Sequence, residues 1–336
     1  MKGSRGPLVE ARDVWKRYEG VVALRDVSLR AAPGEVTVIA GPSGSGKSTL
    51  LRILAGLEDP DSGDILFDGA SVVRDPPWAR NTVMLSQRPI LLPHLTVREN
   101  LVLAAEARGA PRGEAGKLAE EVARRLGITG LLDRKPGTLS GGQLQRASLA
   151  TVLAAKPRVL LLDEPFAHLD LPLRESFRRL VRGLAYGESI TVIQVTHDQD
   201  EALEVADSLA ILVNGRVLEE RDPQSIYYDP GSIETAVFLG HNVACSPPLS
   251  PRRGVPVTFP PEAVSLGEGS LGGVVTYVAA RKHHTLVYID LEGVEVKAVL
   301  AGVRGVKVGA RVRFDVDHGM VKEWPGASEC GVSLYE

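Results

Sequence analysis

The chain has 336 residues and lacks any long hydrophobic run. Its apolar stretches, such as residues 159–162, stay far below the ~18 to 20 residues that a membrane-spanning helix needs. The sequence therefore excludes a chain that crosses a bilayer by itself. The basic residues near the start are not followed by the apolar segment of a secretory signal, which predicts a cytoplasmic location.

A surplus of positive charge is missing as well. Lys and Arg number 39 against 42 Asp and Glu, which gives a formal net charge of −3. A protein held mainly by nucleic-acid phosphates carries a basic surplus, so nucleic acid is not expected as a partner. Cysteine is scarce, because only Cys245 and Cys330 occur and neither belongs to a CxxC pair or a His/Cys cluster. The sequence thus indicates neither a disulfide framework nor a zinc site.

Short apolar runs rich in Val, Ile and Leu occur at residues 36–40, 82–86, 159–163 and 190–196. Continuous apolar character is typical of strands covered on both faces, as in a parallel sheet between helices. Residues 88–155 mostly carry Ala, Leu, Glu and Arg at helical spacing, which predicts a helical subdomain. Asn214-Gly215 separates two apolar runs and predicts a β-hairpin at a sheet edge. The first part of the chain is expected to be α/β.

A change of composition marks a second domain. Residues 244–256 are rich in Pro, Ser and Arg, which opposes regular structure and predicts a linker. Beyond them, short alternating runs punctuated by glycine predict a small antiparallel barrel or sandwich. We expect a first domain at residues 1–240, a linker at 241–256 and a β-rich domain at 257–336.

Residues 41–48 fit the phosphate-binding pattern GxxxxGKS and lie between a predicted strand and a predicted helix, the context that this motif requires. Glycines allow backbone N–H groups to surround phosphate oxygens, Lys47 reaches the β- and γ-phosphates, and the Ser48 hydroxyl can bind Mg²⁺. The predicted nucleotide contacts here are Gly41, Pro42, Ser43, Gly44, Ser45, Gly46, Lys47, Ser48 and the next residue, Thr49.

Two further motifs suit phosphate chemistry. The apolar run 159–163 ends in Asp163, which is placed to hold Mg²⁺, and Glu164 follows it, where a carboxylate can orient and polarise an attacking water. The string Leu139-Ser140-Gly141-Gly142-Gln143 begins a helical run and implies a second anion site at a helix N-terminus.

The order of these motifs along the chain resembles that in the ATPase subunit of ABC transporters. The order is the P-loop at residues 41–48, Gln87, LSGGQ, the strand ending in Asp163-Glu164, an HLD turn at residues 168–170 and His197. The resemblance covers residues 8–240 and implies a P-loop NTPase fold with a helical subdomain. It also implies a homodimer that holds two ATP molecules head to tail.

The resemblance assigns roles by position. It implies that Glu164 is the general base and that His197 contacts the γ-phosphate. The remaining roles are implied in the same way: Tyr18 stacking on adenine, Lys47 and the loop amides on the phosphates, Ser48, Gln87 and Asp163 around Mg²⁺, Ser140, Gly141, Gly142 and Gln143 acting in trans, and Asp170 communicating across the dimer. His168 departs from the alanine or asparagine that the family usually has in the HLD turn, which leaves the details of that communication open.

Residues 225–242 and the strand-rich tail resemble the importer subfamily with a C-terminal OB-like (TOBE) domain, whose members serve sugars, oxyanions, polyamines and ferric iron. Pro261-Glu262 lacks the arginine that usually precedes this pair. The resemblance implies an ATPase that couples hydrolysis to solute import. Implied partners are two integral membrane permease subunits and, indirectly, an extracytoplasmic solute-binding protein. The implied location is the cytoplasmic face of the cell membrane.

Other functions are weighed against this one. A chromosome or DNA-repair ATPase of the superfamily would need a long coiled coil between Gln87 and Ser140, and a ribosome-acting protein would need a second P-loop. An ATP-dependent regulatory or solute-sensing switch remains the alternative. The tail either binds an effector or only supports dimerisation, and the sequence does not identify the solute.

Overall fold

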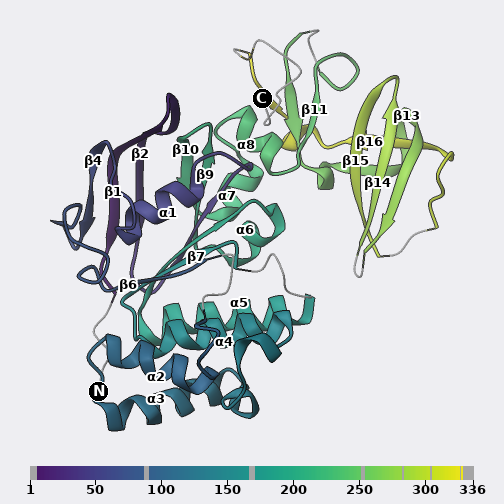
Figure 1. Cartoon of the computed structure of the whole chain (residues 1–336). Coiled ribbons are helices and arrows are strands. Elements are labelled where there is room, and N and C mark those ends of the chain that lie inside the picture. The colour runs from purple at the N-terminus through teal and green to yellow at the C-terminus, as the bar shows by residue number, and fades with distance from the viewer. Residues whose placement is uncertain are drawn as a thin grey trace. The chain divides into compact units, whose positions relative to one another are not determined.

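The computed structural model describes residues 6–86, 91–165, 171–250, 254–281, 284–302, 305–325 and 327. The chain divides into two compact units, Met1–Asp222 and Pro223–Glu336 (Figure 1). The strands of the first unit are β1 (Val9–Tyr18), β2 (Val21–Ala31), β3 (Val36–Ala40), β4 (Ser62–Phe67), β5 (Ala70–Ser71), β6 (Thr82–Leu85), β7 (Val159–Asp163), β8 (Thr191–Thr196), β9 (Ser208–Val213) and β10 (Arg216–Arg221). Its α-helices are α1 (Lys47–Ala55), α2 (Val97–Ala107), α3 (Arg112–Arg125), α4 (Gly141–Ala154), α5 (Leu171–Glu188) and α6 (Gln199–Val205), with short 3-10 helices at Thr129–Leu131 and Pro136–Thr138.

A six-stranded sheet with the order β10-β9-β3-β8-β7-β6 forms the centre of the first unit. β6, β7, β8, β3 and β9 run parallel, and every residue of β3 and β8 is buried. This confirms the parallel sheet predicted from continuous apolar runs. The edge strand β10 pairs antiparallel with β9 through a turn in which Asn214 has φ 49° and Gly215 has φ 76°, as the hairpin signal predicts.

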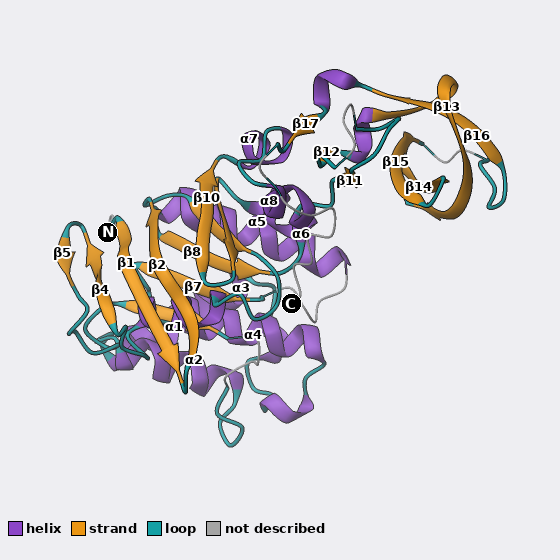
Figure 2. Cartoon of the chain, turned by 90° about the horizontal axis from the view of Figure 1, so that it is seen from above, coloured by secondary structure: helices purple, strands orange, loops and turns teal. Residues whose placement is uncertain are grey.

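A second sheet in this unit, with the order β2-β1-β4-β5, is antiparallel and was not predicted. Its strands alternate buried apolar with charged residues and carry register shifts between β1 and both neighbours. The shared core contains Leu24 and Ile65 from this sheet, Leu50 from α1 and Ile193 from the six-stranded sheet. Helix α1 therefore packs within one core with strands of both sheets (Figures 1 and 2).

The helical subdomain predicted between the P-loop and Asp163 is present. Helix α2 contacts α3 and α4, and all three lie together in Figure 1. α2 begins at a capping box in which the Thr96 side chain accepts from the Glu99 amide and the Glu99 carboxylate accepts from the Thr96 amide. α3 ends two residues before Gly127, whose φ of 63° suits the left-handed position after a helix.

The second unit is rich in strands. Its α-helices are α7 (Pro223–Tyr228) and α8 (Ile233–Phe238), with 3-10 helices at Pro261–Ala263 and His318–Met320. Its strands are β11 (Asn242–Ala244), β12 (Val257–Phe259), β13 (Val264–Ala280), β14 (His284–Leu291), β15 (Val294–Ala301), β16 (Arg311–Val316) and β17 (Lys322–Glu323). They form antiparallel sheets with the orders β11-β12-β17 and β15-β14-β13-β16 around a core that includes Phe259 and Phe314.

The segment predicted as a linker takes part in the second unit. Ala244 and Leu249 belong to its core, and Ser250 is buried. Proline and serine oppose a regular ladder, but they do not prevent the side chains between them from packing. Cys245 is disulfide-bonded, contrary to the expectation from spacing, and the sequence has one other cysteine, Cys330, which lies outside the described residues. That the first domain ends at residue 240 stays a prediction.

Within the described part of the chain, no helix combines the length and the apolar character needed to cross a membrane.

Candidate functional site

The loop at residues 41–46 is shaped by glycines at positions where a side chain cannot fit. A Cβ on Gly41 would lie 2.0 Å from the Leu212 carbonyl oxygen. Gly46, the N-cap of α1, has φ 103°, and a Cβ there would lie 2.4 Å from the Ala23 carbonyl oxygen. The backbone can therefore turn sharply from the buried strand β3 into α1 only with glycine at these points. Ser43 and Gly44 are exposed at the tip, while Pro42 and Ser45 are buried.

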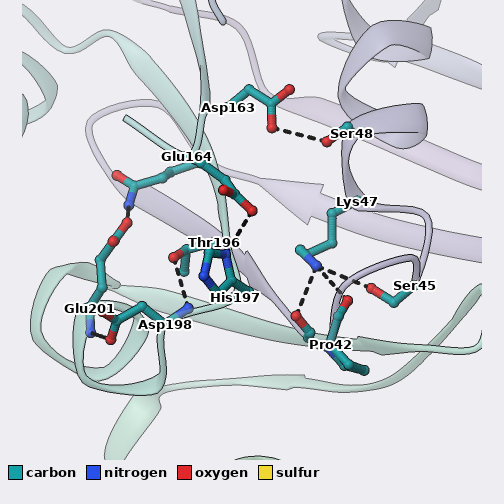
Figure 3. Close-up of polar contacts among 12 residues, drawn as sticks. Pro42, Ser45, Lys47, Ser48, Asp163, Glu164, Thr196, His197, Asp198 and Glu201 are labelled. Carbon is teal, nitrogen blue, oxygen red and sulfur yellow. Dashed lines mark hydrogen bonds and ion pairs between the residues drawn. The ribbon is translucent and has the colours of Figure 1, made fainter. Parts of the chain in front are cut away.

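Lys47 is the first residue of α1, and its side chain bends back across the loop (Figure 3). Its Nζ donates to the carbonyl oxygens of Gly41 at 2.8 Å and Pro42 at 2.7 Å, and to the Ser45 hydroxyl at 3.4 Å. Burial lowers the pKa of Lys47 to about 8, against the opposing effect of the nearby Glu164 and Asp163 carboxylates. The ammonium group is thus a nearly buried cation at the N-terminus of a helix, where anionic ligands bind.

Asp163, at the end of β7, meets the second residue of α1. The Ser48 hydroxyl donates to Asp163 Oδ1 at 3.0 Å, as drawn in Figure 3. Burial raises the pKa of Asp163, and the hydrogen bond from Ser48 lowers it. The fold therefore brings together two oxygen-bearing side chains separated by 115 positions in the sequence, as predicted from the motifs.

These two side chains fit a small divalent cation. Mg²⁺ binds through oxygen ligands, commonly with one or two carboxylates, substrate phosphates and water. A partly buried carboxylate with a raised pKa is stabilised in its ionised form by a cation beside it. Ser48 and Asp163 would thus hold Mg²⁺ together with a nucleotide. The described residues contain no group of three or more His, Cys, Asp or Glu that could hold a metal by themselves.

Glu164 and His197 come from the ends of neighbouring parallel strands. Asp163 is paired with Val195 in the sheet, so the residues that follow β7 and β8 emerge at the same edge. His197 Nδ1 and Glu164 Oε1 are 2.8 Å apart (Figure 3). Glu164 has φ 47°, uncommon for a residue with a side chain, and its amide donates to the Val195 carbonyl oxygen at 3.1 Å. The backbone therefore fixes where the Glu164 carboxylate emerges.

A buried polar pair, Gln194 and Glu201, lies on either side of His197 in the sequence and was not found from the sequence. Asp198 caps α6 by accepting from the Glu201 amide at 3.0 Å. Glu201 is only 4 % exposed, and the fully buried Gln194 donates its side-chain amide to the Glu201 carboxylate. Burial and then the charge of Asp198 raise the pKa of Glu201 to about 7. The sequence signal was an acidic residue on the buried face of a short helix directly after a candidate catalytic histidine.

Ser140, Gly141, Gly142 and Gln143 form the start of α4. The Ser140 amide donates to Gln143 Oε1 at 3.1 Å, which helps to cap this helix. Figure 1 shows α4 among the helices of the subdomain, apart from α1, which carries the P-loop of the same chain. That these residues act in trans stays a prediction.

Another residue that sequence reasoning missed, Gln145, connects α4 to the backbone beside Glu164. Gln145 is 5 % exposed, and its Nε2 donates to the carbonyl oxygen of Pro165 at 3.1 Å. Pro165 directly follows Glu164, so this bond joins the helix that begins with the LSGGQ residues to the backbone beside the Glu164 carboxylate. The available signal was a glutamine among the alanines and leucines of a predicted helix.

Tyr18 lies at the last position of β1 and is 39 % exposed. Its hydroxyl donates to the Glu58 carboxylate, which follows α1 in the chain. Thr49 lies in the first turn of α1. The predicted contacts Gln87 and Asp170, and the unusual His168, lie outside the described residues, so their roles stay predictions.

Comparison with known proteins identifies relatives of the chain. The family model described as "ABC transporter" matches residues 24–167. The sulfate/thiosulfate import ATP-binding protein CysA of Mycobacterium tuberculosis is 40 % identical over 272 residues, 80 % of this chain and 78 % of that protein. The Fe(3+) ions import ATP-binding protein FbpC 1 of Rhizobium meliloti is 41 % identical over 70 % of this chain and 67 % of its own length. The spermidine/putrescine import ATP-binding protein PotA of Lawsonia intracellularis is 39 % identical over 70 % of this chain and 64 % of its own length.

Solved structures also match about two thirds of the chain. The dimeric structure of a bacterial ABC transporter cassette has a TM-score of 0.59 and 32 % identity, covering 64 % of this chain and 98 % of that one. A post-hydrolysis state of a cassette bound to ADP and Pi gives a TM-score of 0.59 and 33 % identity over the same shares. The P-loop, the carboxylate pair at the sheet edge and the extent of these similarities lead to one assignment: the chain belongs to the ATP-binding proteins of the ABC transporter family.

Proposed function

We propose that this protein is the ATP-hydrolysing subunit of an ABC importer and that it couples ATP hydrolysis to the uptake of a small solute through separate membrane subunits. The observation that carries the hydrolytic part is the geometry at one edge of the six-stranded sheet. There the Glu164–His197 pair at 2.8 Å lies directly beside the Ser48–Asp163 pair at 3.0 Å. Water-activating and phosphate-binding groups are thus adjacent.

The proposed chemistry uses the residues of this edge in named roles. Lys47 and the loop amides bind the β- and γ-phosphates of ATP, and Ser48 and Asp163, with Gln87, hold Mg²⁺. When bound, Mg²⁺ neutralises charge that develops on the transferred phosphoryl group. Glu164 orients the attacking water and accepts its proton. His197, held by Glu164 through Nδ1, presents the other edge of its ring to the γ-phosphate.

The proposed partners follow from the relatives and from the chain itself. Dimeric cassettes among the similar structures support a homodimer, with Ser140, Gly141, Gly142 and Gln143 facing the nucleotide of the other subunit and Asp170 communicating between sites. Two permease subunits and an extracytoplasmic solute-binding protein complete the proposed importer. The protein would then lie peripherally at the cytoplasmic face of the membrane. Relatives serving sulfate, Fe(3+) and polyamines are about equally similar, so the solute class is left open.

The importer is favoured over an ATP-dependent regulatory switch. CysA of Mycobacterium tuberculosis and FbpC 1 of Rhizobium meliloti, which match 80 % and 70 % of this chain, are named as import ATP-binding proteins. A switch that only binds ATP has no need for a carboxylate and an imidazole held in contact beside the phosphate site, whereas turnover uses both.

The test is Glu164→Gln, which keeps the size of the side chain and removes its ability to accept a proton. We expect phosphate release to slow by about 10²- to 10³-fold, while the dissociation constant for ATP changes little. Asp200→Asn is the matched control, because Asp200 is an exposed carboxylate of α6 that lies near His197 in the sequence. Unchanged turnover in Glu164→Gln, or equal losses in both variants, would remove Glu164 from the role of general base.

A further inference from the structure

The hydroxyl of Tyr18 is held by a charged residue that no motif assigns. It donates to Oε1 of Glu58, in the loop that follows α1. Burial first and the Glu58 carboxylate second raise the pKa of Tyr18, so the hydroxyl keeps its proton and remains a donor. Tyrosine occupies one of a few staggered rotamers about its first side-chain bond, and this contact favours the rotamer that brings the hydroxyl to Glu58, which fixes where the far end of the ring lies.

The loop that carries Glu58 is itself attached to β1. The Arg17 amide donates to Asp61 Oδ2 at 2.7 Å, and the Asp61 amide donates to the Trp15 carbonyl oxygen at 2.9 Å. Lys16 Nζ donates to the Asp59 carbonyl oxygen at 2.7 Å. These three bonds, all made by the residues directly after Glu58, hold the loop against the end of β1 and so keep the Glu58 carboxylate near Tyr18.

Lys16 completes the arrangement from the same side of the strand. Residues two apart in a strand point to the same face, so Lys16 and Tyr18 are neighbours. Lys16 Nζ lies 3.5 Å from Glu58 Oε1 and 5.5 Å from the centre of the Tyr18 ring, over its face. The side chains of Lys16 and Glu58 are 14 % and 17 % exposed, so this ion pair is screened from water more than an ordinary surface pair. Lys16 thus lies over one face of the ring, and because Tyr18 is still 39 % exposed, part of its surface remains open to a ligand.

The same loop ties the ring to the P-loop. Glu58 follows Gly56, the C-cap of α1, and α1 begins at Lys47. A rigid helix therefore separates the phosphate-binding ammonium group from the carboxylate that holds the ring. A ligand that uses both ends, with an aromatic group on Tyr18 and phosphates at Lys47, meets a spacing that is already set before it binds.

We propose that Glu58 and Lys16 are positioning residues for the nucleotide base: they hold the Tyr18 ring so that its exposed surface accepts a flat purine at a fixed distance from the P-loop. This inference rests on the proposed function, because it requires that the phosphates of a nucleotide bind at Lys47. Neither residue touches the reacting phosphate, so their loss weakens recognition of the base and leaves the chemical step intact.

The experiment compares ADP with inorganic pyrophosphate, a probe that has phosphates and no base, on the full chain by calorimetry. In Glu58→Gln we expect ADP to bind about three- to tenfold more weakly and pyrophosphate to bind as in the wild type. Tyr18→Phe, which keeps the ring and removes the donor, should give the same loss. The double variant should bind ADP about as weakly as either single variant, because both substitutions remove the same contact between Tyr18 and Glu58. In ATP hydrolysis, KM rises and kcat is unchanged.

Control variants separate this inference from the proposed function. Glu10→Gln removes another carboxylate of β1, one paired with Arg12, and should leave ADP binding unchanged. Tyr18→Ala should weaken ADP by about tenfold or more without affecting pyrophosphate. If wild-type protein binds neither ADP nor ATP, the proposed function fails. If it binds ADP but Glu58→Gln and Tyr18→Phe leave ADP affinity unchanged, or weaken pyrophosphate to the same extent, the positioning role is overturned.

Discussion

The phosphate-binding end and the hydrolytic end of the site are built in different ways. Residues 41–48 are one continuous segment, shaped by glycines and by a lysine whose hydrogen bonds all lie within the segment. Glu164 and His197, by contrast, come from two strands and touch only because β7 and β8 are neighbours in the sheet. His197 is also half exposed, whereas Lys47 is almost fully buried.

This difference suggests a division of tasks. In a continuous loop the phosphate-binding groups are kept together by the chain itself, although this loop also packs closely against Ala23 and Leu212. A pair that depends on two strand ends, and on the backbone beside Pro165, responds to any movement that reaches those strands. Gln145, which bonds to the Pro165 carbonyl oxygen, provides one physical connection from α4 to that end. We therefore expect substitutions at the two ends to separate binding from turnover.

The largest effect is expected at the phosphate-binding end. Lys47→Ala removes the nearly buried cation that lies at the N-terminus of α1, so both ATP affinity and turnover should fall, with kcat/KM about 10³-fold lower. Lys307→Ala, an exposed lysine of the second unit, is the control. Equilibrium binding of ATP together with phosphate release measures both quantities. Wild-type ATP affinity in Lys47→Ala would contradict the assignment of the phosphate site.

A smaller effect with a different signature is expected at the hydrolytic end. His197→Ala removes the imidazole that contacts Glu164 and leaves the P-loop unchanged, so kcat should fall by about 10²-fold while the dissociation constant for ATP stays within about threefold of wild type. Single-turnover hydrolysis measures the rate of the chemical step, and equilibrium titration measures the dissociation constant for ATP. A parallel loss of affinity and rate would show that the two ends do not act separately.

The smallest effect concerns the buried carboxyl group of Glu201, in the helix that follows His197. The pKa of Glu201 is raised from 4.5 to about 7, so the folded state binds more protons than the unfolded state between these values. The free energy of unfolding therefore loses the contribution of Glu201 as pH rises through this window, and little of it remains above pH 7. Glu201→Gln keeps the shape of the protonated acid. We expect its stability relative to wild type to increase by about 1 to 3 kcal/mol between pH 5 and pH 8.

Urea unfolding of wild type and Glu201→Gln at both pH values measures this difference. The glutamine can also donate to Gln194 Oε1, a buried oxygen that has no hydrogen-bond partner among the residues that the structure describes. Gln199→Glu, a change of similar size on the same helix at a less buried position, serves as the control. Curves for wild type and Glu201→Gln that run parallel from pH 5 to pH 8 would show that Glu201 does not titrate in this window.

The sequence predicted the six-stranded sheet better than the antiparallel one. Strands buried on both faces appear as continuous apolar runs, which is why β3, β7 and β8 were found. In β1 and β2 the charged residues interrupt the pattern, and register shifts break the alternation between faces. The antiparallel sheet exists because it packs with α1 in a shared core, and such a partner cannot be read from a local pattern.

In the second unit, too, the local sequence pattern predicted the strands but not which side chains pack together. Its short strands with glycine between them were predicted as a small β-domain, and antiparallel sheets are present. Residues 241–256 were expected to form a linker because of the composition of residues 244–256, yet Ala244 and Leu249 pack into the core. Which apolar side chains of an irregular segment become buried depends on the surfaces that meet them.

The sequence by itself predicted the candidate chemistry of the site: the glycines and Lys47 of the P-loop, the Asp163-Glu164 pair and, through the order of the family motifs, His197. The P-loop and the Asp163-Glu164 pair could be read because each consists of residues adjacent in the chain beside a recognisable strand or helix. Tertiary structure alone decided which separate pieces touch. The contacts of Tyr18 with Glu58, of Gln145 with Pro165 and of Glu201 with Gln194 each join different elements, and only packing brings such side chains within hydrogen-bonding distance.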